Sequence, residues 1–134
     1  MDENITLEIV SIKKNLYKIL TDKIKKYNLN LIEGIYLIII DNKKSITFKE
    51  LTINARCDKG MTTKVISSLK EKGLVIFENK EYSLTPLGTK TGKKILKIFE
   101  SLKIELIDKF GLDELTSLKN ELKRLNNILE EIIC

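Results

Sequence analysis

The sequence predicts a mostly helical α+β fold in which two short helices and a single β-hairpin lie between longer helices. Apolar residues recur at steps of three and four along most of the 134 residues, which is the helical period. Two capping boxes mark the starts of short helices inside the chain. One pair of β-rich runs, joined by a polar turn, predicts the hairpin. With one proline and no internal repeat, residues 1–134 are expected to form a single domain.

The first two helices differ in which faces are apolar. Over residues 4–27, isoleucine and leucine form one stripe and lysines fill the other face, which predicts an amphipathic helix. Asn30 and Glu33 have the spacing of a capping box and favour a helix over 31–40, although the run IYLIII is also compatible with a strand. This helix is apolar nearly all round and is expected to be buried. Residues 41–45 are expected to form a polar turn.

A pair of short helices follows. Thr47 and Glu50 form the second capping box, which opens a helix over 48–55. After a break, Asp58 is expected to cap a helix over residues 59–72, which Gly73 ends. This is a helix-turn-helix.

The β-hairpin comes directly after it, with strands at 74–77 and 81–84 and a turn at Asn79 and Lys80. A helix-turn-helix with such a hairpin is a winged helix. The second helix of the pair then fits the DNA major groove, and the wing reaches adjacent phosphates or the minor groove.

Two further helices are predicted at the C-terminus. Proline at position 86 opens a long helix to about Lys109. Gly111 breaks it, and Asp113 is expected to cap the last helix. Leucine and isoleucine at 115–132 then recur at alternating steps of three and four, which is a coiled-coil seam.

Charge and composition favour nucleic-acid binding over catalysis. The net charge is 0 over residues 1–41, +7 over 42–94 and −2 over 95–134, so the basic excess lies in the middle third. The chain has no histidine, and we find no nucleophile–base pair, metal-ligand set or glycine-rich phosphate loop. We therefore expect no enzyme, cofactor or metal. The N-terminus lacks the order of a signal peptide and no run is long enough to span a membrane, so we expect a cytoplasmic protein.

The segment from Ile46 to Val75, ITFKELTINARCDKGMTTKVISSLKEKGLV, resembles the helix-turn-helix of MarR-type transcriptional regulators. It aligns without a gap to a run typical of that family. The matching positions include Thr47, Lys49, Glu50, Leu51, Asp58, Lys59, Thr63, Leu69, Lys72, Gly73, Leu74 and Val75. Ser83-Leu84-Thr85, followed by Gly88, resembles the family's junction between wing and long helix.

The resemblance implies a homodimer that binds double-stranded DNA at a pseudo-palindromic operator. Residues 28–94 would form the DNA-binding lobe, and 1–27 and 95–134 the helical dimerisation arms. The expected dimerisation residues are Ile5, Ile9, Ile12, Leu115, Leu118, Leu122, Leu125, Leu129 and Ile132. The expected DNA contacts are Lys43, Lys44, Thr47, Arg56, Lys59, Gly60, Thr62, Thr63, Lys64, Ser67, Lys70, Asn79 and Lys80. Family members often bind a small-molecule effector, and the sequence identifies none.

The sequence departs from the family at three points. The turn glycine is Arg56, which either binds phosphate or is an ordinary surface residue, and a serine of the recognition helix is Gly60. The wing is short and lacks the arginine that reaches the minor groove in the family, which leaves Lys80 as a weaker substitute. This shortened wing supports an alternative function, a winged helix that binds another protein. Cys57 is expected to fill a small apolar position rather than act as a redox sensor.

Overall fold

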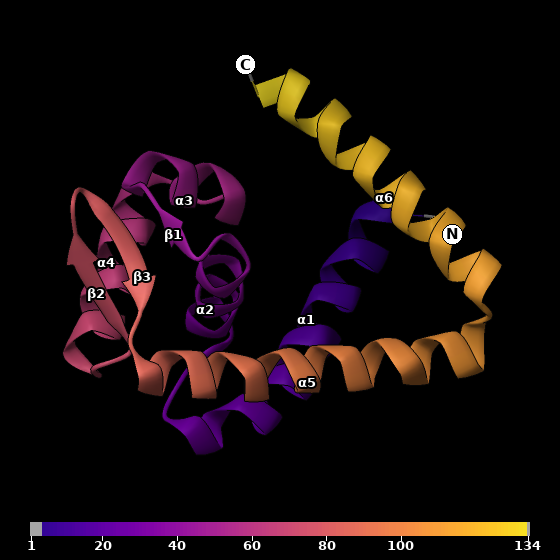
Figure 1. Ribbon diagram of the computed structural model, residues 1–134. Helices are drawn as coiled ribbons and strands as arrows, with labels where there is room; N and C mark the ends of the chain where they lie inside the picture. The colour runs from indigo at the N-terminus through magenta and orange to yellow at the C-terminus, as the bar shows by residue number, and fades with distance from the viewer. Residues whose placement is uncertain (1–3, 134) are drawn as a thin grey trace. The chain divides into compact units, whose positions relative to one another are not determined.

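The computed structural model describes residues 4–133 of the chain, and Cys134 lies outside that range. The chain divides into two compact units, residues 1–98 and 99–134. The first unit contains the helix-turn-helix and the hairpin (Figure 1). The buried hydrophobic residues of the described chain also lie in this unit. The second contains the end of α5 and all of α6.

The elements of the first unit follow the predicted order. They are α1 (Ile5–Ile24), a 3-10 turn η1 (Lys25–Tyr27), α2 (Leu31–Lys43), β1 (Ser45–Ile46), α3 (Phe48–Ala55), α4 (Lys59–Glu71), β2 (Val75–Glu78) and β3 (Glu81–Leu84). Helix α5 (Pro86–Phe110) then starts in the first unit and ends in the second, where α6 (Leu112–Ile133) follows. The prediction of a mostly helical winged fold is confirmed.

Local signals start and end the central helices as expected. The Asn30–Glu33 capping box opens α2, since each backbone N–H bonds to the other residue's side chain, at 2.8 and 2.9 Å. Thr47 and Glu50 open α3 in the same way. Asp58 caps α4 by accepting the N–H of Met61 at 2.7 Å. These satisfied N–H groups are why each helix begins at its predicted residue.

Three predicted details are wrong. Residues 41–43 are not a turn, because α2 continues to Lys43 and ends only where Lys44 adopts a positive φ of 71°. The sheet has a third strand, since β1 pairs antiparallel with β3 in the order β1-β3-β2. Asp113 does not cap the last helix, because α6 already begins at Leu112.

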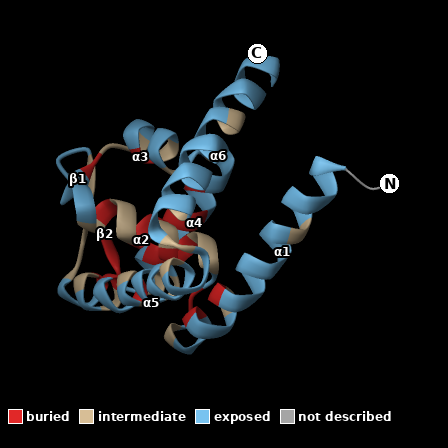
Figure 2. Cartoon of the chain, turned by 90° about the vertical axis from the view of Figure 1, so that its right-hand side faces the viewer, coloured by how far each residue is buried: buried red, intermediate tan, exposed pale blue. Residues whose placement is uncertain are grey.

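The core of the first unit is built around α2. Tyr36, Leu37 and Ile40 of α2 are fully buried, as are Leu51 of α3 and Leu69 of α4. Figure 2 shows buried segments on α2 and α4, whereas α1 is exposed along most of its length. This packing holds α3 and α4 in a fixed relation and leaves one face of α4 free.

Candidate nucleic-acid interface

The turn between α3 and α4 depends on a left-handed residue. Arg56 ends α3 with φ 55° and ψ 40°, and its N–H donates to the carbonyl of Ile53 at 3.1 Å. Most side chains add strain in this conformation, and glycine does not. This explains why the resembling family has a glycine where this chain has an exposed arginine. Cys57, which follows, is half-buried, and its Sγ lies 3.4 Å from the carbonyl oxygen of Ala55.

Arg56→Gly is expected to raise the thermal midpoint of unfolding, with a gain of at most about 1 kcal/mol, because it relieves the left-handed strain. If the guanidinium also binds phosphate, the same change weakens binding to any duplex. Arg56→Gln separates the two effects, because it removes the charge and keeps the strain. Thermal unfolding and DNA titration of both variants check this. If the thermal midpoint of Arg56→Gly is lower than that of wild type, the left-handed conformation of Arg56 does not strain the fold.

Helix α4 is anchored by an apolar stripe and by hydroxyl groups. Val65, Ile66 and Leu69 are buried. Thr62 is fully buried as well, and its Oγ1 lies 2.8 Å from the hydroxyl of Tyr36. Burial raises the pKa of Tyr36 to about 12, so the phenol remains protonated and the pairing is neutral.

This anchoring corrects the expectation for Thr62. Thr52 donates its hydroxyl to Thr62 Oγ1 at 3.0 Å, so the Thr62 side chain is enclosed between α2 and α3. It is therefore not on the surface that would meet DNA, and we remove it from the candidate interface.

The opposite face of α4 is exposed and carries no acidic residue before Glu71. The predicted contact residues on this face are Lys59, Gly60, Thr63, Lys64, Ser67 and Lys70, all of them exposed. Thr63 donates its hydroxyl to the carbonyl of Lys59 at 2.9 Å, so its lone pairs and methyl group remain available. Such groups can accept a hydrogen bond from a base amino group or contact a thymine methyl.

The wing is a two-residue hairpin. Asn79 and Lys80 have φ values of 53° and 65°, the pair of left-handed residues that a type I′ turn requires. The rings of Phe77 and Tyr82 contact each other across the strands behind the tip, with their centroids 4.6 Å apart and their planes tilted by 42°. The tip is therefore exposed and short.

An open groove of about 820 Å³ joins the wing to the helix-turn-helix, with Lys80, Lys59 and Thr47 on its walls. Phe48, Lys49, Thr52 and Ile53 of α3 complete its lining. Lys49 was missed as a candidate, although it matches the family motif. Thr47 is half-buried and its hydroxyl donates to Glu50 at 2.8 Å, so its main role in the structure is to cap α3.

The remaining flanking lysines lie elsewhere. Lys43 ends α2 and lines a separate hollow with Asp41 and Asn54. Lys44 follows it as the exposed residue that caps α2. The groove between the wing and the helix-turn-helix is therefore lined by Lys59 and Lys80 and not by Lys43.

The arm helices carry the predicted dimerisation residues. On α1, Ile5, Ile9 and Ile12 are between 38% and 64% exposed. On α6, Leu115 and Leu125 are half-buried, and the exposed residues of the stripe are Leu118, Leu122, Leu129 and Ile132.

Within residues 4–133 we find no helix long and apolar enough to cross a membrane. The same residues contain no group of three potential metal ligands.

A helix-turn-helix followed by a two-stranded wing defines the class of winged-helix proteins. No family model matches the chain. It is 31% identical over 103 residues to an uncharacterized HTH-type transcriptional regulator of Methanocaldococcus jannaschii, covering 76% of this chain and 82% of that protein. The chain belongs to the family of HTH-type transcriptional regulators.

Solved structures identify the type of winged helix. Ligand-free NadR superposes with a TM-score of 0.86 at 17% identity, covering 98% of this chain and 99% of that one. MepR of S. aureus, solved as a DNA complex, gives 0.84 at 14% identity, with coverages of 96% and 99%. A mutant MarR of E. coli with operator DNA gives 0.79 at 22% identity, with coverages of 90% and 91%. The fold is that of the MarR-type regulators.

Proposed function

We propose that the protein is a homodimeric regulator that binds double-stranded DNA at a pseudo-palindromic operator, with α4 in the major groove. Residues 28–94 form the DNA-binding lobe, and the arms at 1–27 and 95–134 join the two copies. Two-fold symmetry then places the recognition helices in successive major grooves, about 34 Å apart.

The exposed face of α4 is the observation that carries this proposal. It presents lysines and small hydroxyl side chains, with its first acidic residue at Glu71. A helix of this kind fits the major groove, where each base pair has its own pattern of donors and acceptors. MepR and MarR, which share the fold, have been solved with DNA.

Phosphate contacts are assigned to the cations around α4. Lys59 and Lys80 line one groove, and Lys44 and Arg56 are exposed at helix ends. Long cationic side chains at such positions fix a protein on the DNA backbone without reading sequence. Minor-groove reading is not part of the proposal, because the wing tip offers only Asn79 and Lys80.

Exposed apolar side chains on the arms support the dimer. Ile5 and Ile12 of α1 are 64% and 50% exposed, and Leu122 and Ile132 of α6 are 47% and 73% exposed. Each helix carries several such side chains along its own length, and monomeric proteins rarely leave large apolar patches in water. A second copy of the chain covers these side chains in the proposed assembly.

Selection from a random duplex library with the full-length protein tests this function. The selected duplex is expected to bind at least roughly 1,000-fold more tightly than a scrambled duplex of the same composition. Binding is also expected to weaken steeply with salt, as counterions are released. A library that yields no enriched duplex would favour the alternative, a winged helix that binds another protein.

Lys44→Ala and Lys80→Ala are each expected to weaken the selected and scrambled duplexes by similar factors. Each removes one phosphate contact, so the slope of log affinity against log salt should fall in magnitude by about one. Lys90→Ala, an exposed lysine of α5 outside the groove, is the control. An unchanged slope in both variants would remove these lysines from the interface.

A further inference from the structure

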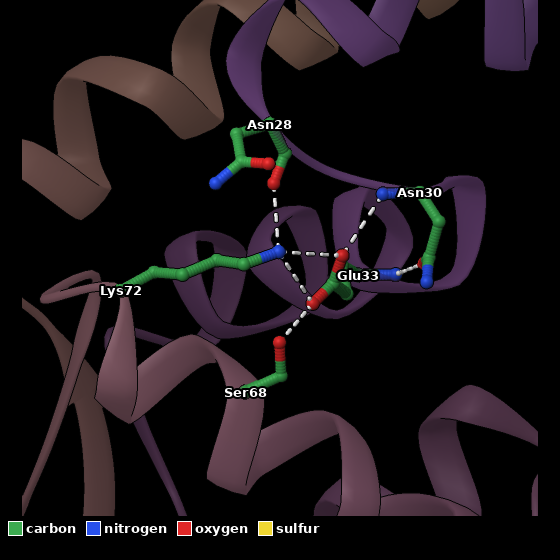
Figure 3. A network of polar contacts seen from close by, with 5 residues as sticks. All are labelled: Asn28, Asn30, Glu33, Ser68 and Lys72. Atoms are coloured by element: carbon green, nitrogen blue, oxygen red, sulfur yellow. Dashed lines mark hydrogen bonds and ion pairs between the residues drawn. The ribbon is translucent and has the colours of Figure 1, made fainter.

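A partly buried ion pair connects α4 to the start of α2. Glu33 of α2 is only 4% exposed, and its Oε2 lies 3.1 Å from Nζ of Lys72, the residue that ends α4 (Figure 3). Ser68, one turn earlier on α4, donates its hydroxyl to the same carboxylate oxygen. The backbone N–H of Asn30 donates to Oε1 at 2.9 Å. The carboxylate is therefore held from α4 and from the N-terminus of its own helix.

The ammonium group of Lys72 also has a full set of hydrogen-bond partners. It donates to Glu33 Oε1 at 3.2 Å, to Oε2 at 3.1 Å and to the carbonyl oxygen of Asn28 at 2.7 Å. Three acceptors match its three N–H donors. Asn28 lies in the left-handed turn that ends η1, between α1 and α2. Lys72 thus ties the end of α4 to the junction of the N-terminal arm with the lobe.

This network supplies what the apolar stripe of α4 does not. Val65, Ile66 and Leu69 hold the helix against the core, but apolar contacts have little directionality. Ser68 and Lys72 lie four residues apart, on one face of the helix, and both bonds have a required geometry. Together they fix how far α4 is rotated about its axis and where it lies along that axis.

The stability of the fold does not by itself account for the ion pair. Glu33 is removed from water and Lys72 partly so, which costs both groups hydration, and an apolar pair of similar volume often stabilises a protein at least as well. The hydrogen bonds nevertheless keep Glu33 charged. Burial raises the pKa of its carboxyl, but the bonds from Ser68 and Asn30 and the charge of Lys72 outweigh burial, and the pKa lies below its ordinary value of 4.5. The network is therefore intact at neutral pH.

We propose that Glu33 is a positioning residue for DNA reading, which acts through Ser68 and Lys72 to set the rotation and axial place of α4. Thr63 and Lys64 then meet base edges in one register. The inference rests on the proposed function and extends it, because none of these three residues contacts DNA in that proposal.

The test compares Lys72→Met and Ser68→Ala with wild type on the selected and scrambled duplexes, at a temperature where all are folded dimers. Methionine keeps the length of lysine without its charge. In both variants, the ratio of the affinity for the selected duplex to that for the scrambled duplex is expected to fall about tenfold. The slope of log affinity against log salt should not change, since neither Ser68 nor Lys72 contacts a phosphate in the proposed complex. Lys72→Arg, which retains the charge, should restore most of the discrimination, and Lys90→Met should leave it unchanged.

Hydrogen exchange on the DNA-free protein tests the mechanical part separately. The amides of α4 are expected to exchange faster in Lys72→Met than in wild type, with those of α3 unchanged. Unchanged exchange in α4, or intact discrimination in both variants, would overturn the inference. A wild-type protein that does not distinguish the duplexes would overturn the proposed function itself. The wild-type measurement therefore separates a failure of the proposed function from a failure of the positioning role of Glu33.

Discussion

Leu122→Glu is expected to turn the protein from a dimer into a monomer at micromolar concentration. In the proposed assembly Leu122 lies at the middle of the α6 seam, and it is 47% exposed on the single chain. A carboxylate buried there without a partner destabilises the interface by roughly 3–5 kcal/mol per copy. Because each 1.4 kcal/mol is about tenfold in affinity, dissociation should be complete. Light scattering or sedimentation measures the mass directly.

Asn120→Glu is the matched control for this change. It adds the same charge to the same helix, two residues away, at an exposed position off the apolar stripe. We expect it to remain a dimer. A wild-type protein that is monomeric, or a dimer that survives Leu122→Glu, would contradict the assignment of α6 to the interface.

Gly88→Ala is expected to destabilise the fold severely, by roughly 3 kcal/mol or more. A Cβ at position 88 would lie 2.0 Å from the carbonyl oxygen and 2.9 Å from the carbonyl carbon of Leu74. These are backbone atoms, and the same oxygen accepts the N–H of Thr85 at 3.0 Å, so it cannot withdraw without breaking that bond. The contact lies where α5 begins, directly after the wing.

Gly92→Ala, one turn further along α5, provides the comparison. Its added Cβ would lie 3.7 Å from Leu84 Cδ1, an ordinary contact. Alanine also favours the helix by about 1 kcal/mol over glycine, so this variant should be as stable as wild type or more so. Thermal unfolding of the two variants decides the matter, and equal midpoints would show that the close approach at position 88 is wrong.

The sequence predicts those parts of the fold that have local signals. The capping residues Asn30, Thr47 and Asp58 bond to N–H groups three residues away, so their partners are visible in the sequence itself. The turn at Asn79 and Lys80 is equally local. Because these signals mark the start of each central helix and the tip of the hairpin, the winged helix-turn-helix follows from the sequence.

Features that depend on distant partners could not be predicted. Strand β1 has only two residues and exists because Ser45 and Ile46 pair with β3, almost forty positions later. Lys72 finds Glu33 across a similar separation. Neither pairing has a periodicity or spacing that marks it in the sequence.

The candidate site shows the same division. Helical periodicity places Thr63, Lys64 and Ser67 on the exposed face of α4, and the structure places them there. Thr62 was expected among the DNA contacts, but the structure places it on the buried side of α4. The hydroxyls of Tyr36 and Thr52 settle its position, because they supply the hydrogen-bond partners that allow a polar side chain to be buried.

The central claim is that α4 reads base edges, and Thr63→Ala with Lys64→Ala tests it most directly. Each variant is titrated on the selected and scrambled duplexes over a range of salt concentrations. Thr116→Ala is the control, since its hydroxyl donates to the carbonyl of Leu112 at 2.8 Å much as Thr63 donates to Lys59. Each α4 variant is expected to lose about 1–3 kcal/mol on the selected duplex and less on the scrambled one. Thr63→Ala should leave the salt slope unchanged because it removes no charge. If both variants still distinguish the selected duplex from the scrambled one as well as wild type does, the assignment of α4 to the major groove is contradicted.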